Sequence, residues 1–298
     1  MNMRRYDVAI VGGGPAGLSA ALVLARACRS IAVIDAGTPR NNASPGVHAF
    51  LSRDGILPAD LKETSRKQIA NYPDVEFFDQ PVRHIRAAQS ENGFRVALTN
   101  GHTLSAAVVI LAVGVIDELP DMPEFEQHWG RRIIHCPFCH GFENSGGHWG
   151  VLAKDLDDIE KALNYVHWTE SLTVLAEQRI HIPEELLKSL ADKNIAIDRR
   201  SVRQIISSDD GVLQAVEMHD GSQLSCTTLV YRPRQRQTDM VNDSGVALTE
   251  TGRVWIDDNY QTNIPGIFAA GDLTPGCQDA LAAAAEGAKA AKNALDAI

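Results

Sequence analysis

The sequence predicts an α/β protein in which two strand-helix-strand units build parallel sheets. An apolar strand pattern over residues 6–11 leads into a glycine-rich turn and then into a helix-like stretch over residues 18–27. Residues 149–175 repeat the order of strand, helix and strand. A late strand runs into Gly271-Asp272, which would place a carboxylate where ligands of parallel sheets bind. A chain of 298 residues is long enough for two such nucleotide-binding-like domains.

Composition and charge restrict the partners. The hydrophobic content of 44% supports a large buried core, and the formal net charge is −10. That charge argues against nucleic acid and anionic membranes as partners, because both would repel it. No apolar run reaches the roughly 18 residues that a bilayer span requires, and residues 1–5 lead directly into a strand pattern. We expect a soluble cytoplasmic protein that acts on small or neutral molecules.

The first turn carries a dinucleotide-binding pattern. Its residues are Gly12, Gly13, Gly14, Pro15, Ala16 and Gly17. Gly12 permits the sharp turn, Gly14 lets a pyrophosphate approach the backbone, and Gly17 lets helix and strand pack closely. The strand over residues 30–34 ends in Asp35, the expected place for a carboxylate that hydrogen-bonds a ribose. The alternative is an ordinary tight turn between a strand and a helix.

The segment after Asp35 is less specific. Arg40 and Asn41 lie in the stretch over residues 38–42, and the arginine could contact an adenine or a phosphate or lie in a solvated loop. Residues 60–72 predict a helix, and short alternating strands over residues 75–111 predict a β-meander. The last of these strands ends in Ala112-Val113-Gly114, which suggests close approach of the backbone to a ligand. We place the first domain boundary near residue 116.

The second strand-helix-strand unit lacks a phosphate-binding turn. Between the strands over residues 149–153 and 172–175 the turn contains Asp155, Asp157 and Asp158 and no glycine. These carboxylates are interpreted as charges that favour a helix N-terminus. Residues 176–179 after the second strand offer one positive charge, Arg179, beside a negative one. We therefore expect nicotinamide nucleotide binding to be lost or severely weakened.

The remaining segments predict a second meander over residues 201–229 and a helix over residues 278–297. The basic stretch over residues 232–236 is interpreted as a solvated loop or a crossover between domains.

A Cys-x-x-Cys element between two histidines, His135-Cys136-Pro137-Phe138-Cys139-His140, predicts a redox centre. Two cysteines at this spacing can close a small disulfide ring, and histidines can move the protons of thiol chemistry. Haem attachment, zinc binding and a structural disulfide are the alternatives. Haem attachment requires export, and the sequence shows no signal peptide. A zinc site needs a second pair of ligands, which the sequence lacks, so we expect no bound metal. The other cysteines, Cys28, Cys226 and Cys277, are interpreted as small buried hydrophobic residues.

Together, the glycine-rich turn with Asp35, the 112–114 strand end, the Cys-x-x-Cys element and the stretch over residues 262–272 resemble the low-molecular-weight thioredoxin reductases along almost the whole chain. The resemblance implies two Rossmann-like, three-layer ββα domains, with an FAD domain over residues 1–116 and 244–298 and an inserted domain over residues 117–243. It also implies a homodimer. Asp272 would hydrogen-bond the ribityl chain, and the helix that starts near Gln278 would point its N-terminus at the flavin. The expected FAD contacts are Gly12, Gly14, Pro15, Ala16, Gly17, Asp35, Arg40, Asn41, Ala112, Gly114, Gly271, Asp272, Gln278, Asp279 and Ala280.

Two departures from thioredoxin reductases resemble another branch. The second cysteine is followed by His140 instead of aspartate, and the inserted domain lacks the NADPH signature. Both features resemble the FAD-dependent dithiol oxidases that close the disulfide of gliotoxin, holomycin and romidepsin. The stretch Thr38-Pro39-Arg40-Asn41, followed by His48 and Arg53-Asp54-Gly55, also resembles that branch. That branch uses oxygen as the electron acceptor.

The implied roles follow from this second resemblance. A small dithiol would react at Cys136, Cys139 would be the sulfur on the flavin side, and His140 would hold the proton, with His135 as a weaker candidate. Two other functions stay open. One is a reductase that draws on NADPH or ferredoxin, and the other is a redox sensor or flavin-binding protein without fast turnover.

Overall fold

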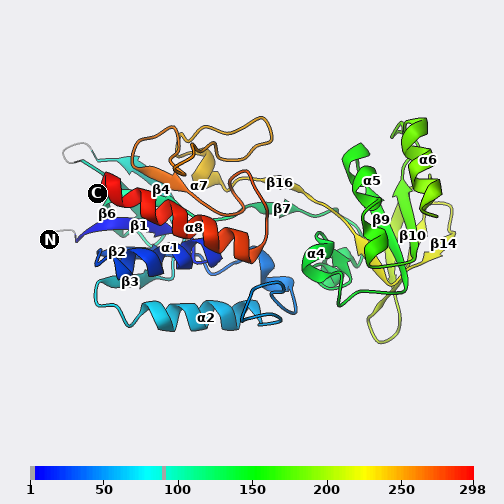
Figure 1. Cartoon of the computed structure of the whole chain (residues 1–298), viewed down its shortest axis with the longest axis horizontal. Helices are drawn as coiled ribbons and strands as arrows, with labels where there is room; N and C mark the ends of the chain where they lie inside the picture. Colours follow the sequence, from blue (N-terminus) through cyan, green and yellow to red (C-terminus); the bar gives the residue numbers. More distant parts are fainter. Residues whose placement is uncertain (1–3, 89–91) are drawn as a thin grey trace. The chain divides into compact units, whose positions relative to one another are not determined.

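The computed structural model describes residues 4–88 and 92–298 and divides into two compact units (Figure 1). Unit 1 combines Met1–Asn42, Phe50–Asp117 and Gln235–Ile298, and unit 2 combines Ala43–Ala49 and Glu118–Arg234. The first division lies beside the expected residue 116, whereas the return to unit 1 comes at Gln235 and not at 244. The sequence also gave no indication that the short segment 43–49 belongs to unit 2. No helix in the described ranges is long and apolar enough to cross a bilayer.

Unit 1 contains one large sheet. Its strands are β1 (Arg5–Val11), β2 (Ile31–Ile34), β3 (Val75–Phe78), β4 (Val82–Ala87), β5 (Phe94–Leu98), β6 (Thr103–Leu111) and β17 (Ile267–Ala269). Its helices are α1 (Pro15–Arg26), α2 (Pro58–Ile69), α7 (Asp239–Asn242) and α8 (Ala280–Ala294), with the 3-10 turns η1 (Arg40–Ala43) and η3 (Leu295–Ala297). The strand order is β3-β2-β1-β6-β5-β4, and β17 also pairs with β6. All pairings except β4 with β5 and β5 with β6 are parallel.

Period-2 alternation along the central strands separates two cores in unit 1. In β6, Val108 and Ile110 pack on the face shared with residues of α1 and α8. Val109 and Leu111 pack on the opposite face, with residues of β4 and β5. Because both faces are covered, the strand is apolar throughout, as expected for a buried parallel strand. In Figure 1, α8 (red) lies beside α1 (blue) in this unit, although the two helices are far apart in the sequence.

Unit 2 also contains a parallel sheet, which is smaller than the sheet of unit 1. Its strands are β8 (Ile133–Ile134), β9 (His148–Ala153), β10 (Ser171–Ala176), β11 (Ala196–Asp198), β12 (Val202–Ser207), β13 (Leu213–Met218), β14 (Gln223–Ser225) and β15 (Thr228–Val230). Its helices are α3 (Phe125–His128), α4 (Pro137–His140), α5 (Leu156–Ala162) and α6 (Glu184–Asp192), with the 3-10 turn η2 (Tyr165–His167). The order β11-β10-β9-β15-β8 forms a parallel sheet, and β12-β13-β14 forms the expected meander. The connecting strands β7 (Ile116–Glu118) and β16 (Arg234–Arg236) pair with each other, so the basic stretch is largely a crossover.

Two expected meander strands belong to parallel sheets instead. β3 pairs with β2 in unit 1, and β15 pairs with β8 and β9 in unit 2. Short apolar runs of this kind fit either arrangement, and the choice depends on partners that are distant in the sequence. The α/β class with two Rossmann-like sheets is confirmed.

Candidate functional site

The glycine-rich turn of unit 1 leaves one face of its backbone open. A Cβ atom on Gly12, whose φ is +118°, would lie 2.1 Å from the carbonyl oxygen of Ala112. A Cβ on Gly17 would lie 1.9 Å from the carbonyl oxygen of Gly12. A Cβ on Gly14 would meet no atom within 4 Å. Two glycines are therefore required by the packing of the protein, and the third faces open space that a pyrophosphate can occupy.

The turn leads into α1 with Pro15 at its first position and Ala16 next. The proline fits because its missing N–H would have no helical partner there. The remaining free N–H groups at this helix start suit an anion.

Asp35 follows β2 and lies beside the turn. A Cβ on Gly13 would come within 2.4 Å of the Asp35 Oδ2 atom, and Lys62 Nζ lies 2.5 Å from the same oxygen. The Asp35 Oδ1 atom accepts a hydrogen bond from the Gly37 amide at 3.2 Å. The carboxylate is thus held at the edge of the turn, where the sequence predicted a contact with ribose.

A polar network connects three of the predicted residues. Arg40 Nη1 donates to Asp272 Oδ2 at 2.9 Å and to Gln278 Oε1 at 3.3 Å, and Arg40 Nε donates to Asp117 Oδ2 at 2.7 Å. Gln235 also donates to Asp117, at 2.7 Å. Burial raises the pKa of Asp272, and the neighbouring Arg40 opposes that rise. Arg40 therefore lies in a half-buried ionic network, and the solvated-loop interpretation is wrong.

One atom of this network has no hydrogen-bond partner among the residues that the structure describes. This atom is Arg40 Nη2, which is buried. A buried guanidinium donor without a partner is costly, so an acceptor on a bound ligand would stabilise it. Asn41 follows in η1 and is half-buried.

The carboxyl end of β17 approaches the first turn of α1. A Cβ on Gly271 would lie 3.0 Å from the Cβ of Ala16, and the Gly271 amide donates to Glu286 Oε2 at 2.8 Å. Asp279 caps α8 by accepting from the Ala282 amide at 2.7 Å, so the helix begins at Ala280. Directly after β6, the Ala112 amide donates to the Val11 carbonyl at 2.7 Å, which joins the ends of β6 and β1.

Gly114 follows with a φ of +65°, and a Cβ there would meet no atom within 4 Å. The open face of Gly14, the orphaned Arg40 donor and the start of α8 together fit an FAD molecule. FAD would contact the turn through its pyrophosphate and the Asp272 region through its ribityl chain.

Replacing Arg40 by methionine is expected to leave Asp117 and Asp272 as two half-buried carboxylates without their cation. Breaking such a pair by removing one partner typically costs about 3–5 kcal/mol of unfolding free energy. Urea denaturation followed by circular dichroism measures this loss. Arg40→Lys keeps the charge and should lose less, and wild-type stability in the methionine variant would contradict the network.

The redox centre lies in unit 2, on the short helix α4. The amides of Cys139 and His140 both donate to the Cys136 carbonyl, at 3.1 and 3.2 Å. Cys136 is the N-cap residue of α4 and Cys139 lies in its single turn, so the two cysteines are held at opposite ends of one short turn. Both cysteines are half-buried. This arrangement allows the sulfurs to interchange between thiol and disulfide with little movement of the backbone.

Asn144 anchors the redox helix and was not singled out by the sequence. Its side chain is buried, and Nδ2 donates to the carbonyl of His140 at 2.9 Å. Arg132 donates to Asn144 Oδ1 at 3.2 Å, and the Trp149 indole donates to the Asn144 carbonyl at 2.9 Å. The loop after α4 is therefore fixed to the sheet of unit 2. A lone asparagine in a loop gives no signal by which the sequence could have revealed this role.

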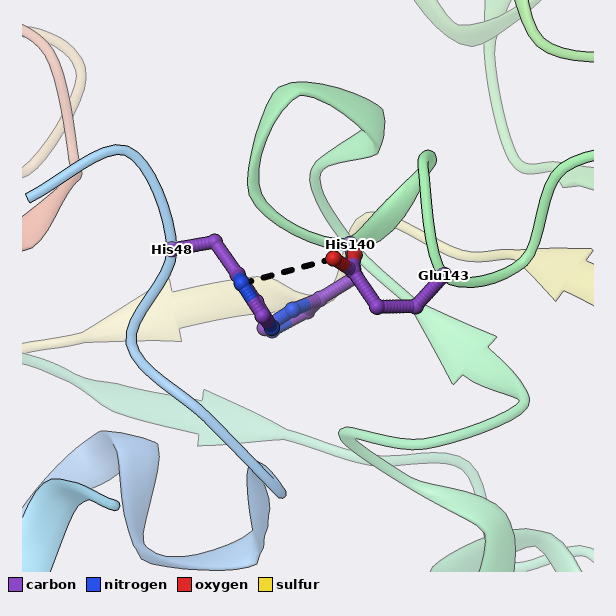
Figure 2. A group of neighbouring side chains, drawn as sticks. All are labelled: His48, His140 and Glu143. Atoms are coloured by element: carbon purple, nitrogen blue, oxygen red, sulfur yellow. Dashed lines mark ion pairs between the residues drawn. The ribbon is translucent and has the colours of Figure 1, made fainter. Parts of the chain in front are cut away.

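His140 is the buried histidine of this centre, with 8% of its surface exposed. Burial lowers its pKa, nearby His48 lowers it further, and Glu143 opposes the shift. Figure 2 shows His48, from the segment 43–49, converging with His140 and Glu143. The His48 Nδ1 atom lies 3.4 Å from Glu143 Oε1, and the Ser44 hydroxyl lies 3.4 Å from His140 Nε2. A neutral, buried imidazole next to the cysteines can accept a proton.

His135, the weaker candidate, is half-buried on the other side of the cysteines, with its ring centroid 6.0 Å from that of Trp129.

The acidic turn after β9 is a helix cap. Asp155 accepts from the Asp158 amide, and Asp158 accepts from Lys154 Nζ at 2.8 Å. Hydrogen bonds from Lys161 and Arg232 lower the pKa of Asp157 to about 2, so the turn stays negatively charged. The interpretation as charges that favour a helix N-terminus is confirmed. These carboxylates occupy the place where a phosphate-binding turn would present free N–H groups.

More basic residues gather after β10 than the sequence suggested. An open cavity of about 420 Å³ is lined by Arg179, Arg199, Arg200 and His219 among others. The parallel pairing of β10 with β11 brings residues 199–200 beside residue 179, which the local sequence could not reveal. Arg179 pairs with Glu177, Arg200 pairs with Asp198, and Arg199 donates to two carbonyl groups. Residues 176–179 carry one positive charge as expected, but Arg199 and Arg200 from the segment after β11 join it, and these charges are largely matched.

Comparison with known proteins gives a consistent result. The family model of pyridine nucleotide-disulphide oxidoreductases matches residues 6–287. Thioredoxin reductase sirT from Leptosphaeria maculans is 33% identical over 284 residues, which cover 90% of this chain and 86% of that protein. Thioredoxin reductase tcpT from Claviceps purpurea is 31% identical over 275 residues, which cover 89% of this chain and 86% of that protein. The crystal structure of HlmI superposes with a TM-score of 0.91 at 31% identity, covering 98% of this chain and 92% of that one.

Proposed function

Since the chain belongs to the pyridine nucleotide-disulphide oxidoreductase family, whose cofactor is FAD, we propose that it is a dithiol oxidase that forms a disulfide in a small-molecule natural product. The observation that carries the proposal is the pairing of an intact redox centre, Cys136 and Cys139 with His140, with an acidic cap in place of a second phosphate-binding turn. A protein of this kind keeps its thiol chemistry but has little means to bind a nicotinamide nucleotide.

The proposed reaction starts with the sulfurs of this chain in the disulfide form. One substrate thiolate attacks the Cys136 sulfur and breaks the bond to Cys139, and the second substrate thiolate then displaces Cys136. The substrate leaves as a disulfide, and both cysteines remain reduced. FAD held by the glycine-rich turn and the Arg40–Asp272 network would supply a two-electron acceptor when the Cys136–Cys139 disulfide re-forms. Oxygen would be the final acceptor of the electron pair and would leave with both protons as hydrogen peroxide.

His140 is the proton acceptor in this proposal. Its burial keeps the imidazole neutral, so it can take the thiol proton of Cys139 and leave a thiolate. His135 is kept as a second candidate because it precedes Cys136 directly.

Oxygen consumption tests the proposal directly. Purified enzyme mixed with a dithiol in air is expected to consume oxygen and produce an equal amount of hydrogen peroxide, without any pyridine nucleotide. A panel of rigid cyclic dithiols and flexible linear ones would define the preferred substrate class. Oxygen uptake no faster than that of free FAD would reject an oxidase.

Two further proposals are a homodimer and a cytoplasmic location. Gel filtration would test the homodimer, and cell fractionation would test the location.

A reductase is the second candidate, and the arginine-lined cavity after β10 favours it. That cavity lies at the carboxyl end of parallel strands, where nucleotides bind in such folds. Rapid anaerobic bleaching of the flavin by NADPH would support the reductase and count against the oxidase.

A further inference from the structure

Three side chains from two separate segments meet beside the redox cysteines in unit 2. The segment Ala43–Ala49 belongs to unit 2 although the chain on both sides of it belongs to unit 1. It supplies His48, which approaches His140 and Glu143 (Figure 2). Each of the three offers a polar atom within 4.8 Å of the others, and the His48 and His140 rings meet edge to face at 5.9 Å.

The exposure of the three side chains to solvent increases from His140 through His48 to Glu143. His140 is 8% exposed, whereas the side chains of His48 and Glu143 are 19% and 37% exposed. A proton taken up by His140 would place a positive charge in a site that water scarcely reaches. Such a charge needs a nearby counter-charge and a route to solvent, and Glu143 and His48 stand where they can provide them.

We propose that Glu143 and His48 are positioning residues for His140, with Glu143 stabilising its protonated form and His48 passing the proton to water. This proposal rests on the proposed role of His140 and extends it to two residues outside the Cys-x-x-Cys element. The S–H bond of Cys139 breaks, an N–H bond forms on His140, and the proton then leaves through His48 or a water molecule that bridges the pair. No electron moves in this step.

The charged groups that act on His140 are His48 and Glu143, and the backbone at Cys139 contributes a hydrogen bond. Their influences have opposite signs. His48 lowers the pKa of His140, whereas Glu143 and a backbone hydrogen bond at Cys139 raise it. Removing Glu143 and removing His48 should therefore shift the chemistry of Cys139 in opposite directions, which a merely structural role would not do.

The test measures the rate at which iodoacetamide alkylates Cys139, as a function of pH, in the FAD-loaded Cys136→Ser protein. Glu143→Gln removes the charge that stabilises protonated His140, so the midpoint of the profile should rise by about one pH unit. His48→Ala removes a repulsive neighbour, so the midpoint should fall. In a His140→Asn background neither change should have an effect, which identifies His140 as the mediator. The exposed residues Glu126 and His181 provide matched controls, as Glu126→Gln and His181→Ala.

A second measurement separates the proton route from the shape of the site. Turnover of His48→Ala with a dithiol should fall and should recover when free imidazole is added, because imidazole can carry the proton in place of the side chain. Equal shifts of the alkylation midpoint in both variants, or shifts of the same sign, would overturn the proposal. So would stoichiometric zinc in the purified protein that is lost in both variants, because the three side chains would then be ligands. Alkylation needs no turnover, so failure of this proposal is distinguishable from failure of the oxidase.

Discussion

The Cys139→Ser enzyme is expected to lose turnover by roughly three orders of magnitude or more while it still binds FAD. Serine cannot form the disulfide that receives the substrate electrons, and Cys136 would be the one sulfur left in the Cys-x-x-Cys element. Steady-state oxygen uptake measures turnover, and the flavin absorption of the desalted protein measures cofactor content.

Cys136→Ser should show the same loss, because a single remaining cysteine cannot close the ring. The two variants should differ in one respect: only the protein that keeps Cys136 should form a stable mixed disulfide within the Cys-x-x-Cys element when it is treated with an activated substrate analogue. Peptide mass spectrometry locates this adduct and separates it from adducts at the exposed Cys28 and Cys277. Cys226→Ser is a suitable control, because Cys226 is buried and burial raises the pKa of its thiol to about 12. Near-normal turnover in either Cys136→Ser or Cys139→Ser would end the assignment of the redox centre.

The second large effect is a loss of FAD affinity or of stability when Gly14 or Gly17 of the first turn is replaced, each separately, by alanine. Gly14→Ala adds a methyl group that meets no protein atom within 4 Å, so the protein should fold normally. The same methyl group would stand where the pyrophosphate approaches, and FAD affinity should fall about tenfold to a hundredfold, as for an overpacked contact of 1–3 kcal/mol.

Gly17→Ala should behave differently. Its Cβ would lie 1.9 Å from the Gly12 carbonyl oxygen, so the backbone of the turn must shift. We expect a loss of about 1–3 kcal/mol in unfolding free energy, together with poor retention of FAD. Fluorescence titration with FAD and urea denaturation of both variants separate the two effects. Equal destabilisation of the two variants would contradict the open face at Gly14.

The local part of the fold was predictable because adjacent residues carry it. The first strand, the glycine-rich turn, α1 and β2 were expected within a few residues of their observed bounds. Glycines that tolerate a sharp turn, together with Asp35 at the end of the next strand, act over short sequence separations. The Cys-x-x-Cys element is equally local, with Cys136 as the N-cap of α4 and Cys139 within that helix.

The pairing of short strands was harder to predict. β3 and β15 were expected in meanders, yet each pairs in parallel with strands far away in the sequence. Neither strand has a periodicity that separates the two arrangements, so the tertiary partners decide.

The surroundings of the candidate site depend most on tertiary structure. Arg40 reaches Asp272 across 232 residues, and Ser44 reaches His140 across 96. Arg199 joins Arg179 only because β11 lies beside β10. No local pattern encodes such contacts.

The sequence alone determined which chemistry this protein can perform, because the cysteine spacing, the glycine turn and the missing second glycine turn are properties of neighbouring residues. The tertiary structure decided which groups surround that chemistry. It brings His48 and Glu143 to His140 and encloses Arg40 between two carboxylates. Burial and charge from distant segments set proton affinities, and these exist only once the chain has folded.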